Sequence, residues 1–237
     1  MTPDDILKLF SNLAVELDDL QFLIKTHPLL AHYTSLSVLE KILKTDELWL
    51  SNPLFMNDLE EVRFGVLEGA RLFLQGDAIT QACGSNTTRA DTLKHAFNHY
   101  FEQFNKEQAF DTYVFCMSEH GPKNSDGRLS MWRGYGGQGT GAALVFNTAF
   151  VTAPNDNSPL IISRVHYASA EDRRTWLNQK LLAWCDILRN SAIPDNMLHV
   201  AAYWFFSLIK LFALKSKHHG FQEECEWRLI YLPDRDP

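Results

Sequence analysis

The sequence is poor in the features that mark secreted, membrane-spanning and nucleic-acid-binding proteins. Its 4 cysteines include no C-x-x-C pair, so buried free thiols in a reducing compartment are favoured over a disulfide or zinc framework. The N-terminus has neither the basic start nor the continuous apolar stretch of a signal peptide. The longest apolar region, residues 197–214, is interrupted by His199, Ser207 and Lys210, which indicates a buried helix and not a membrane span. These absences predict a cytoplasmic protein without a membrane partner.

Positive charge is also scarce. The chain has 22 Lys and Arg against 29 Asp and Glu, a net charge of -7, which argues against a nucleic-acid backbone as the main partner. It contains no G-x-S-x-G elbow, P-loop or H-E-x-x-H motif. The glycine-rich run at residues 134–141 precedes an expected strand, so it is a turn or an anion-approaching loop and not a dinucleotide fingerprint. His218 and His219 are adjacent, which does not suit zinc, and no metal is expected.

The chain is long enough, at 237 residues with 46% hydrophobic content, to bury a substantial core. A capping Thr2 and Pro3 start a helix that we expect to extend to about Lys25. Further helices are predicted at residues 36–44, 59–73, 90–106, 170–190 and 194–216, with a surface loop at 76–89. Short strands are predicted at residues 29–33, 48–51, 112–117, 142–146, 160–167 and 224–232.

This order of elements predicts the α+β class, with a small mixed or antiparallel sheet and several packed helices. We expect an N-terminal helix over residues 1–28, followed by one α+β domain over residues 29–237. Within that domain, residues 170–216 form a helical insertion before the last strand.

Four polar and aromatic islands lie at the edges of apolar segments, where loops carry side chains on a rigid scaffold. They occupy residues 32–35, 51–60, 116–136 and 223–228. In the third island, Trp132, Arg133 and Tyr135 supply stacking and cation-binding groups. Four such islands in one domain predict a single assembled cleft.

The last island carries paired carboxylates. Residues two apart on a strand share a face, so Glu224, Glu226 and Arg228 are expected on one side. Neighbouring carboxylates raise each other's pKa while an arginine stabilises their ionised forms, which suits a general base or a transition-state stabiliser. The alternative is a solvent-facing strand with an ion pair. His32, at a strand end, is either a donor to a ligand oxygen or a histidine satisfied by backbone.

The order of these motifs resembles the bacterial and phage family DUF2971, a domain of unknown function, from about Leu30 to Leu232. A more distant resemblance links an early histidine and a glutamate on the last strand to the ADP-ribosyltransferases. That resemblance implies that His32 orients a ribose of NAD and that Tyr135 or Tyr33 packs on the nicotinamide. It also implies that Glu226 stabilises the oxocarbenium-like transition state, with Glu224 as the first acid of a glutamate-x-glutamate pair.

The candidate catalytic residues are therefore Glu226 and Glu224. The candidate NAD-binding residues are His32, Tyr33, Thr34, Ser51, Ser118, Trp132, Arg133, Tyr135 and Arg228. The resulting hypothesis is an NAD-consuming transferase or glycohydrolase, in a toxin or phage-defence setting, with a protein or nucleic-acid acceptor. It predicts that His32 and Glu226 face one cleft together with Arg133 or Tyr135.

Two other hypotheses stay open on the same residues. One is a non-catalytic module that binds a nucleotide or a protein in the cleft. The other is a nucleic-acid-processing enzyme in which Asp58, Glu60 and Glu226 hold a divalent metal.

Overall fold

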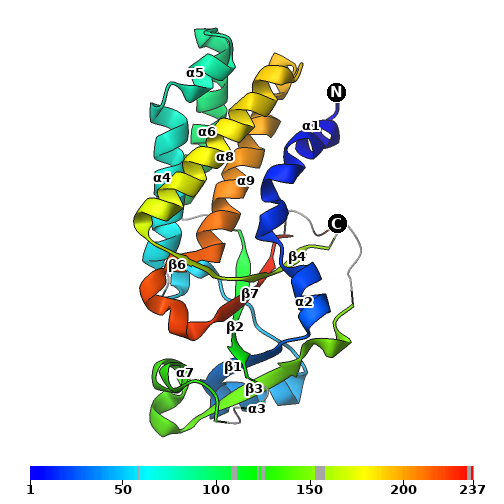
Figure 1. The fold of residues 1–237 in the computed structure, drawn as a ribbon, viewed down its shortest axis with the longest axis vertical. Helices are drawn as coiled ribbons and strands as arrows, with labels where there is room; N and C mark the ends of the chain where they lie inside the picture. Colours follow the sequence, from blue (N-terminus) through cyan, green and yellow to red (C-terminus); the bar gives the residue numbers. More distant parts are fainter. Residues whose placement is uncertain are drawn as a thin grey trace. The chain divides into compact units, whose positions relative to one another are not determined.

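A computed structural model describes residues 1–57, 59–107, 111–121, 123, 126–152, 158–233 and 236 (Figure 1). The chain divides into two compact units. The helical unit comprises Met1–Leu17, Asn57–Phe110 and Ala168–Ser216, and the sheet unit comprises Asp18–Met56, Asp111–Tyr167 and Lys217–Pro237. The predicted α+β class is confirmed. The predicted division into residues 1–28 and 29–237 stays a prediction.

The helical unit is built around one apolar helix. Its elements are α1 (Pro3–Phe10), η1 (Ser11–Leu17), α4 (Leu59–Gln75), α5 (Ala78–Ala82), α6 (Thr87–Glu107), α8 (Ala170–Asn190), η5 (Asp195–Met197) and α9 (Leu198–Lys215). Helix α9 packs against α1, α4 and α6 and buries most of its residues, as its all-round apolar pattern predicted. By length and composition, Asp195–Lys215 is also apolar enough to cross a membrane, but 72% of its most apolar 18-residue window is buried, as in a core helix.

Two sequence predictions in this region were wrong. Residues 76–89 are not a plain loop, because they include α5 and the first turn of α6. The first helix does not extend to Lys25; it ends at Phe10, passes through η1 and resumes as α2 (Leu20–Thr26) in the sheet unit. Side chains that bond to the backbone interrupt it, since the Ser11 hydroxyl donates to the Lys8 carbonyl and Asp18 accepts from the Leu20 amide.

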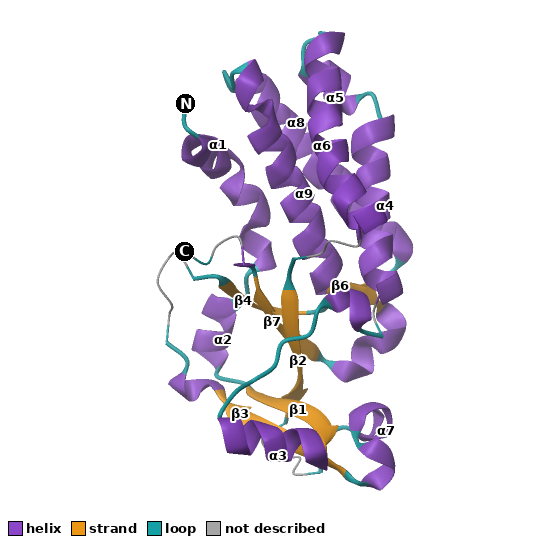
Figure 2. Cartoon of the chain, turned by 180° about the vertical axis from the view of Figure 1, so that it is seen from behind, coloured by secondary structure: helices purple, strands orange, loops and turns teal. Residues whose placement is uncertain are grey.

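The sheet unit contains a five-stranded antiparallel sheet in the order β3-β1-β2-β7-β4 (Figure 2). Its strands are β1 (Leu29–Ser35), β2 (Tyr113–His120), β3 (Gly141–Asn147), β4 (Leu160–Arg164) and β7 (Glu226–Tyr231). A separate ladder pairs β5 (His166–Ala168) with β6 (Ser216–His218). The connecting elements are α2, α3 (Leu36–Thr45), η2 (Pro53–Phe55), α7 (Leu129–Tyr135), η3 (Gly137–Gly139), η4 (Thr148–Phe150) and η6 (His219–Glu224).

Strands β1 and β2 pair over a short stretch only. Residues Leu29–Ala31 pair with β2, whereas β1 pairs with β3 along its whole length. Farther along, Ser51 forms a single antiparallel bridge with Val114 of β2. The predicted strand at residues 48–51 therefore reduces to this bridge.

Alternation gives the sheet two different faces. On the apolar face, Leu30, Phe115, Met117 and Trp227 are buried together and pack against Leu23 of α2. On the opposite, polar face, the ladder places Ser118 beside Glu226 and Cys116 beside Arg228. The register thus decides which candidate residues can meet.

Helices α4 and α9 approach closely at Gly65, where an added Cβ would lie 2.7 Å from Ala213 Cβ and 2.9 Å from its Cα. The neighbour is backbone, so it cannot turn away. We therefore expect Gly65→Ala to lower the free energy of unfolding of the full chain by about 1–3 kcal/mol in urea titrations. Gly134→Ala in α7, with open space around the added methyl, is the control and should be neutral or stabilise by up to about 1 kcal/mol. A stabilised Gly65→Ala variant would contradict the close approach.

Candidate functional site

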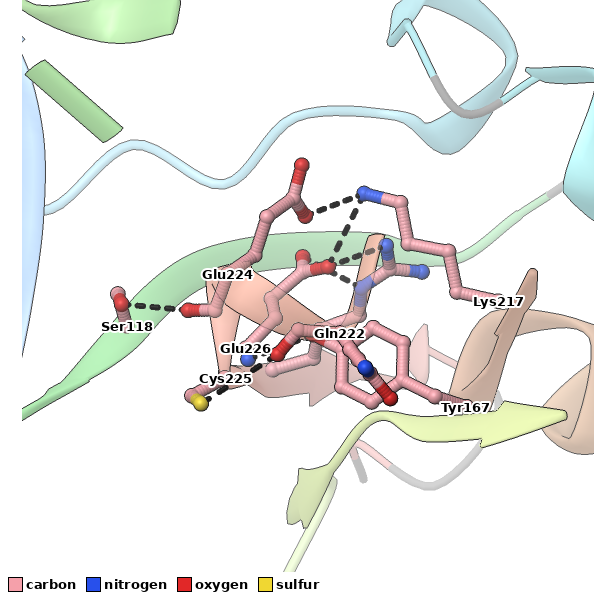
Figure 3. Close-up of polar contacts among 8 residues, drawn as sticks. Ser118, Tyr167, Lys217, Gln222, Glu224, Cys225 and Glu226 are labelled. Atoms are coloured by element: carbon pink, nitrogen blue, oxygen red, sulfur yellow. Dashed lines mark hydrogen bonds and ion pairs between the residues drawn. The ribbon is translucent and has the colours of Figure 1, made fainter. Parts of the chain in front are cut away.

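Four charged residues gather on the polar face of the sheet unit (Figure 3), and we call them the charge cluster: Lys217, Glu224, Glu226 and Arg228. Arg228 grips Glu226 with two bonds, Nε to Oε1 at 2.8 Å and a terminal nitrogen to Oε2 at 3.0 Å. Lys217 Nζ lies 2.6 Å from Glu224 Oε2 and 3.5 Å from Glu226 Oε2. The side chains of Lys217, Glu226 and Arg228 are 2%, 5% and 3% exposed, so this is an internal network of two cations and two anions.

Neighbouring strands hold the cluster in place. The backbone N–H of Glu226 donates to the Tyr167 hydroxyl at 2.8 Å, and the Ser118 hydroxyl donates to the Glu224 carbonyl at 2.5 Å. The Cys116 side chain of β2 also helps to lower the pKa of Glu226. These bonds tie the start of β7 to β2 and β5.

Glu224 does not belong to the last strand, contrary to the prediction. The last strand begins at Glu226, so Glu224 is the final residue of η6 and not part of the alternating pattern. Cys225 between them adopts a left-handed conformation, φ 41°, which turns the chain from η6 into β7. The alternative of a solvent-facing ion pair is also wrong, because Glu226 and Arg228 are buried.

The charges around Glu226 fix its protonation state. Burial acts to raise the pKa of Glu226, but the Arg228 guanidinium and the Lys217 ammonium outweigh it and hold the pKa below its usual range. The carboxylate is therefore ionised at neutral pH. A low pKa makes a poor proton acceptor but suits stabilisation of developing positive charge. Burial raises the pKa of Tyr167, which therefore stays a neutral hydroxyl beside the cluster.

Tyr33 and Trp132 form a locked aromatic pair on the polar side of β1. Tyr33 is two residues after Ala31, so their side chains lie on the same face of the sheet. Ala31 pairs across the ladder with Ser118 of the polar face. The two rings meet edge to face at 4.9 Å, and the Tyr33 hydroxyl accepts from the Arg128 amide at 2.9 Å. The Trp132 indole donates to the Asp126 carbonyl at 2.6 Å. The pair is therefore held rigidly by the start of α7.

His32 lies on the apolar face, not beside Glu226. Its neighbour in the register is Leu144, and its ring stacks on Phe115 at 4.3 Å. Nδ1 bonds the Cys116 carbonyl at 2.8 Å, and burial lowers the pKa of the ring. The neutral tautomer that donates from Nδ1 leaves Nε2 as an acceptor. Ala31 pairs with Ser118, which in turn pairs with Glu226, so the Ala31 and Glu226 side chains share a face. His32 is the next residue after Ala31, and its side chain therefore lies on the opposite face. The predicted cleft shared by His32 and Glu226 is not formed.

The remaining candidates lie apart from the cluster. Thr34 follows His32 by alternation onto the apolar face. Ser51 is exposed and bonds Val114 through its backbone. Arg133 and Tyr135 are exposed on α7. Of the candidate residues, the polar face therefore carries Tyr33, Ser118, Glu224, Glu226 and Arg228, with Trp132 packed on Tyr33.

Sequence reasoning missed three contributors: Lys217, Tyr167 and Arg128. Lys217 lies two residues after the end of α9, the most apolar helix. A charged residue so close to an apolar helix is the one sequence signal that could have identified it. Arg128 links α7 to the sheet and η6 by donating to the Glu119 and Glu223 carbonyls at 2.9 and 3.4 Å. Neither that contact nor the Tyr167 bond has a local sequence pattern.

The metal hypothesis gains no geometric support. Among the described residues, no group of three or more His, Cys, Asp or Glu side chains is placed to hold a metal ion. Asp58 lies outside the described residues. Glu60 belongs to the helical unit, where it pairs with Arg63 at 3.4 Å, while Glu226 belongs to the sheet unit.

The chain is thus an α+β protein whose sheet unit carries a buried charge cluster and, on the same face of the sheet, an aromatic pair. Residues 131–229 match the DUF2971 family, described as a protein of unknown function. This match confirms the family resemblance over residues 131–229, a segment that contains Trp132 and the whole charge cluster, and does not extend to the earlier motifs from Leu30 onward. No curated protein and no solved structure matches the chain.

Removing Arg228 should leave the buried Glu226 carboxylate without its main partner and so lower the stability of the protein. We expect Arg228→Met to lower the free energy of unfolding by about 3–5 kcal/mol, because the carboxylate loses its bidentate partner inside the protein. Arg133→Met, which removes an exposed arginine, should change it by less than about 0.5 kcal/mol. The measurement is urea unfolding of both variants. Equal stability of the two variants would show that the ion pair is not buried.

Acid should destabilise the sheet unit through the same carboxylate. The folded pKa of Glu226 lies below its unfolded value, so the stabilisation is complete above the unfolded pKa, about 4.3, and is lost as pH falls through the folded pKa. Between pH 6 and pH 3, unfolding free energies should therefore fall more steeply for the wild type than for Glu226→Gln. Parallel slopes for the two proteins would indicate an unperturbed carboxyl.

Proposed function

We propose that the sheet unit binds NAD against its polar face and cleaves the bond between nicotinamide and ribose, passing ADP-ribose to water or to another acceptor. The observation that carries this proposal is the ionised, water-shielded carboxylate of Glu226 on the sheet face that also carries Tyr33. The resemblance to ADP-ribosyltransferases that the sequence suggests extends to Glu226 on the last strand and Ser118 on a middle strand, but not to His32, which lies on the other face.

The chemistry follows from the charges. Nicotinamide leaves with the bonding electron pair, and positive charge develops on the ribose, where a carboxylate at close range stabilises it. That is the role of Glu226. The acceptor oxygen then bonds to the ribose carbon and gives up its proton. Glu224, whose side chain is 16% exposed against 5% for Glu226, is the carboxylate better placed to take that proton.

The aromatic pair and Lys217 complete the site. Tyr33 is 5% exposed and packs on Met131 in the core. The partly buried Trp132 ring, which Tyr33 and the Asp126 carbonyl hold in place, is therefore the member of the pair that can stack on the nicotinamide without losing conformational freedom. Lys217 Nζ lies 3.5 Å from Glu226 Oε2, farther than the 2.8 Å of the Arg228 contact. A pyrophosphate oxygen that drew Lys217 away would remove one of the cations beside Glu226 and strengthen the field of the carboxylate at the sugar.

A second candidate function is a non-catalytic nucleotide-binding module. Two observations favour it: His32 lies on the other face of the sheet, and Glu226 is already engaged by Arg228. In this case the aromatic pair would bind the base, and the charge cluster would be structural.

Nicotinamide release from NAD by the purified full chain separates the two candidates. The transferase function requires turnover in the wild type and at least about a hundredfold loss in Glu226→Gln, with NAD affinity retained. Glu223→Gln is the matched control, because Glu223 is exposed and precedes the cluster. Circular dichroism confirms that each variant is folded.

Three other outcomes of this assay would contradict one or both candidate functions. Binding of NAD without turnover would establish the binding module and reject the transferase. Turnover that is unchanged in Glu226→Gln would remove Glu226 from the mechanism. If the wild type neither binds nor turns over NAD, both candidate functions are rejected for NAD.

A further inference from the structure

The apolar face of the sheet unit contains a cavity of about 270 Å³. Its floor is formed by large side chains of all five strands: Leu30, Phe115, Phe146, Ile162 and Leu229, with Met117 beside them. Phe146, Ile162 and Leu229 are only partly buried although they belong to the core of this face. Their apolar surface therefore opens into the cavity.

The cavity is lined almost entirely by apolar surface. Of the fourteen described residues that line it, ten are apolar, and the other four are Asp18, Thr148, Thr152 and Ser158. The Thr148 hydroxyl already donates to the Pro28 carbonyl. The single ionisable side chain among these residues is the carboxylate of Asp18, which is exposed. A ligand in this cavity thus meets hydrocarbon over almost all of its surface, with the Asp18 carboxylate as the one charged group among the described lining residues.

We infer that this cavity is a binding site for a small apolar ligand that ends in a hydroxyl or amine, such as a medium-chain alcohol or an aromatic amine. An apolar cavity of this size stays poorly hydrated and gains from filling by hydrocarbon. At the packing density of protein interiors it accommodates roughly a dozen carbon atoms. A carboxylate-ended ligand would instead bring its charge toward Asp18.

The site is independent of the proposed NAD chemistry. Leu30, Phe115, Met117 and Leu229 alternate with the residues of the polar face, so the cavity and the charge cluster lie on opposite faces of the sheet. Failure of one proposal therefore leaves the other standing.

Fluorescence titration of the full chain with aminoanthracene, a neutral apolar amine, tests this inference. We expect saturable enhancement and displacement of the probe by decanol, with decanoate about fivefold weaker than decanol because of Asp18. In Asp18→Asn, that preference should disappear while the affinity for decanol persists.

Blocking variants locate the site. Val151 lines the cavity and is 38% exposed, so Val151→Trp can fill the opening without overpacking the core. It should weaken the probe at least about tenfold, since the indole occupies the ligand's space. Val15→Trp, at a 68% exposed position of the helical unit, is the matched control and should bind like the wild type. Leu48→Trp, at a second exposed lining position, replaces Val151→Trp if that variant does not fold.

Three results would overturn the inference. They are no saturable binding of aminoanthracene or decanol to the folded wild type, equal affinity in the blocking and control variants, and a preference for decanoate over decanol.

Discussion

The buried ion pair between Glu226 and Arg228 is the constraint on which the rest of the polar face depends. A carboxylate that is 5% exposed requires a partner inside the protein, and the bidentate arginine supplies it at 2.8 and 3.0 Å. Lys217 extends the network to Glu224, which fixes η6 beside the sheet. The same contacts that keep this unit folded keep Glu226 ionised, so stability and the proposed chemistry share one group of atoms.

Strand pairing divides the candidate residues between two environments. The three-residue pairing of β1 with β2 fixes Ala31 opposite Ser118, and the next residue, His32, then belongs to the other face. On that face it stacks on Phe115, a residue that also lines the cavity. One sheet therefore separates a buried charge cluster from an apolar cavity, and the two proposed ligands would lie on opposite sides of its backbone.

The sequence predicted features that depend on neighbours along the chain. Capping at Thr2 and Ser35, the internal character of α9, and the shared face of Glu226 and Arg228 all follow from local patterns. The position of His32 relative to Glu226 does not follow from local patterns. Alternation predicts which residues share a face within one strand, but the register between strands is set by tertiary packing. Nor does any local pattern bring Lys217 to Glu224 or turn the chain at Cys225.

Direct titration of the Glu226 carboxyl carbon by NMR, in the full chain labelled with ¹³C-glutamate and assigned with Glu226→Gln, would test this arrangement most directly. The structure requires a pKa below the usual glutamate value of about 4.3, because Arg228 and Lys217 stabilise the ionised form against burial. A pKa at or above that usual value would mean that the carboxylate is unpaired, and both the charge cluster and the role given to Glu226 would then be wrong.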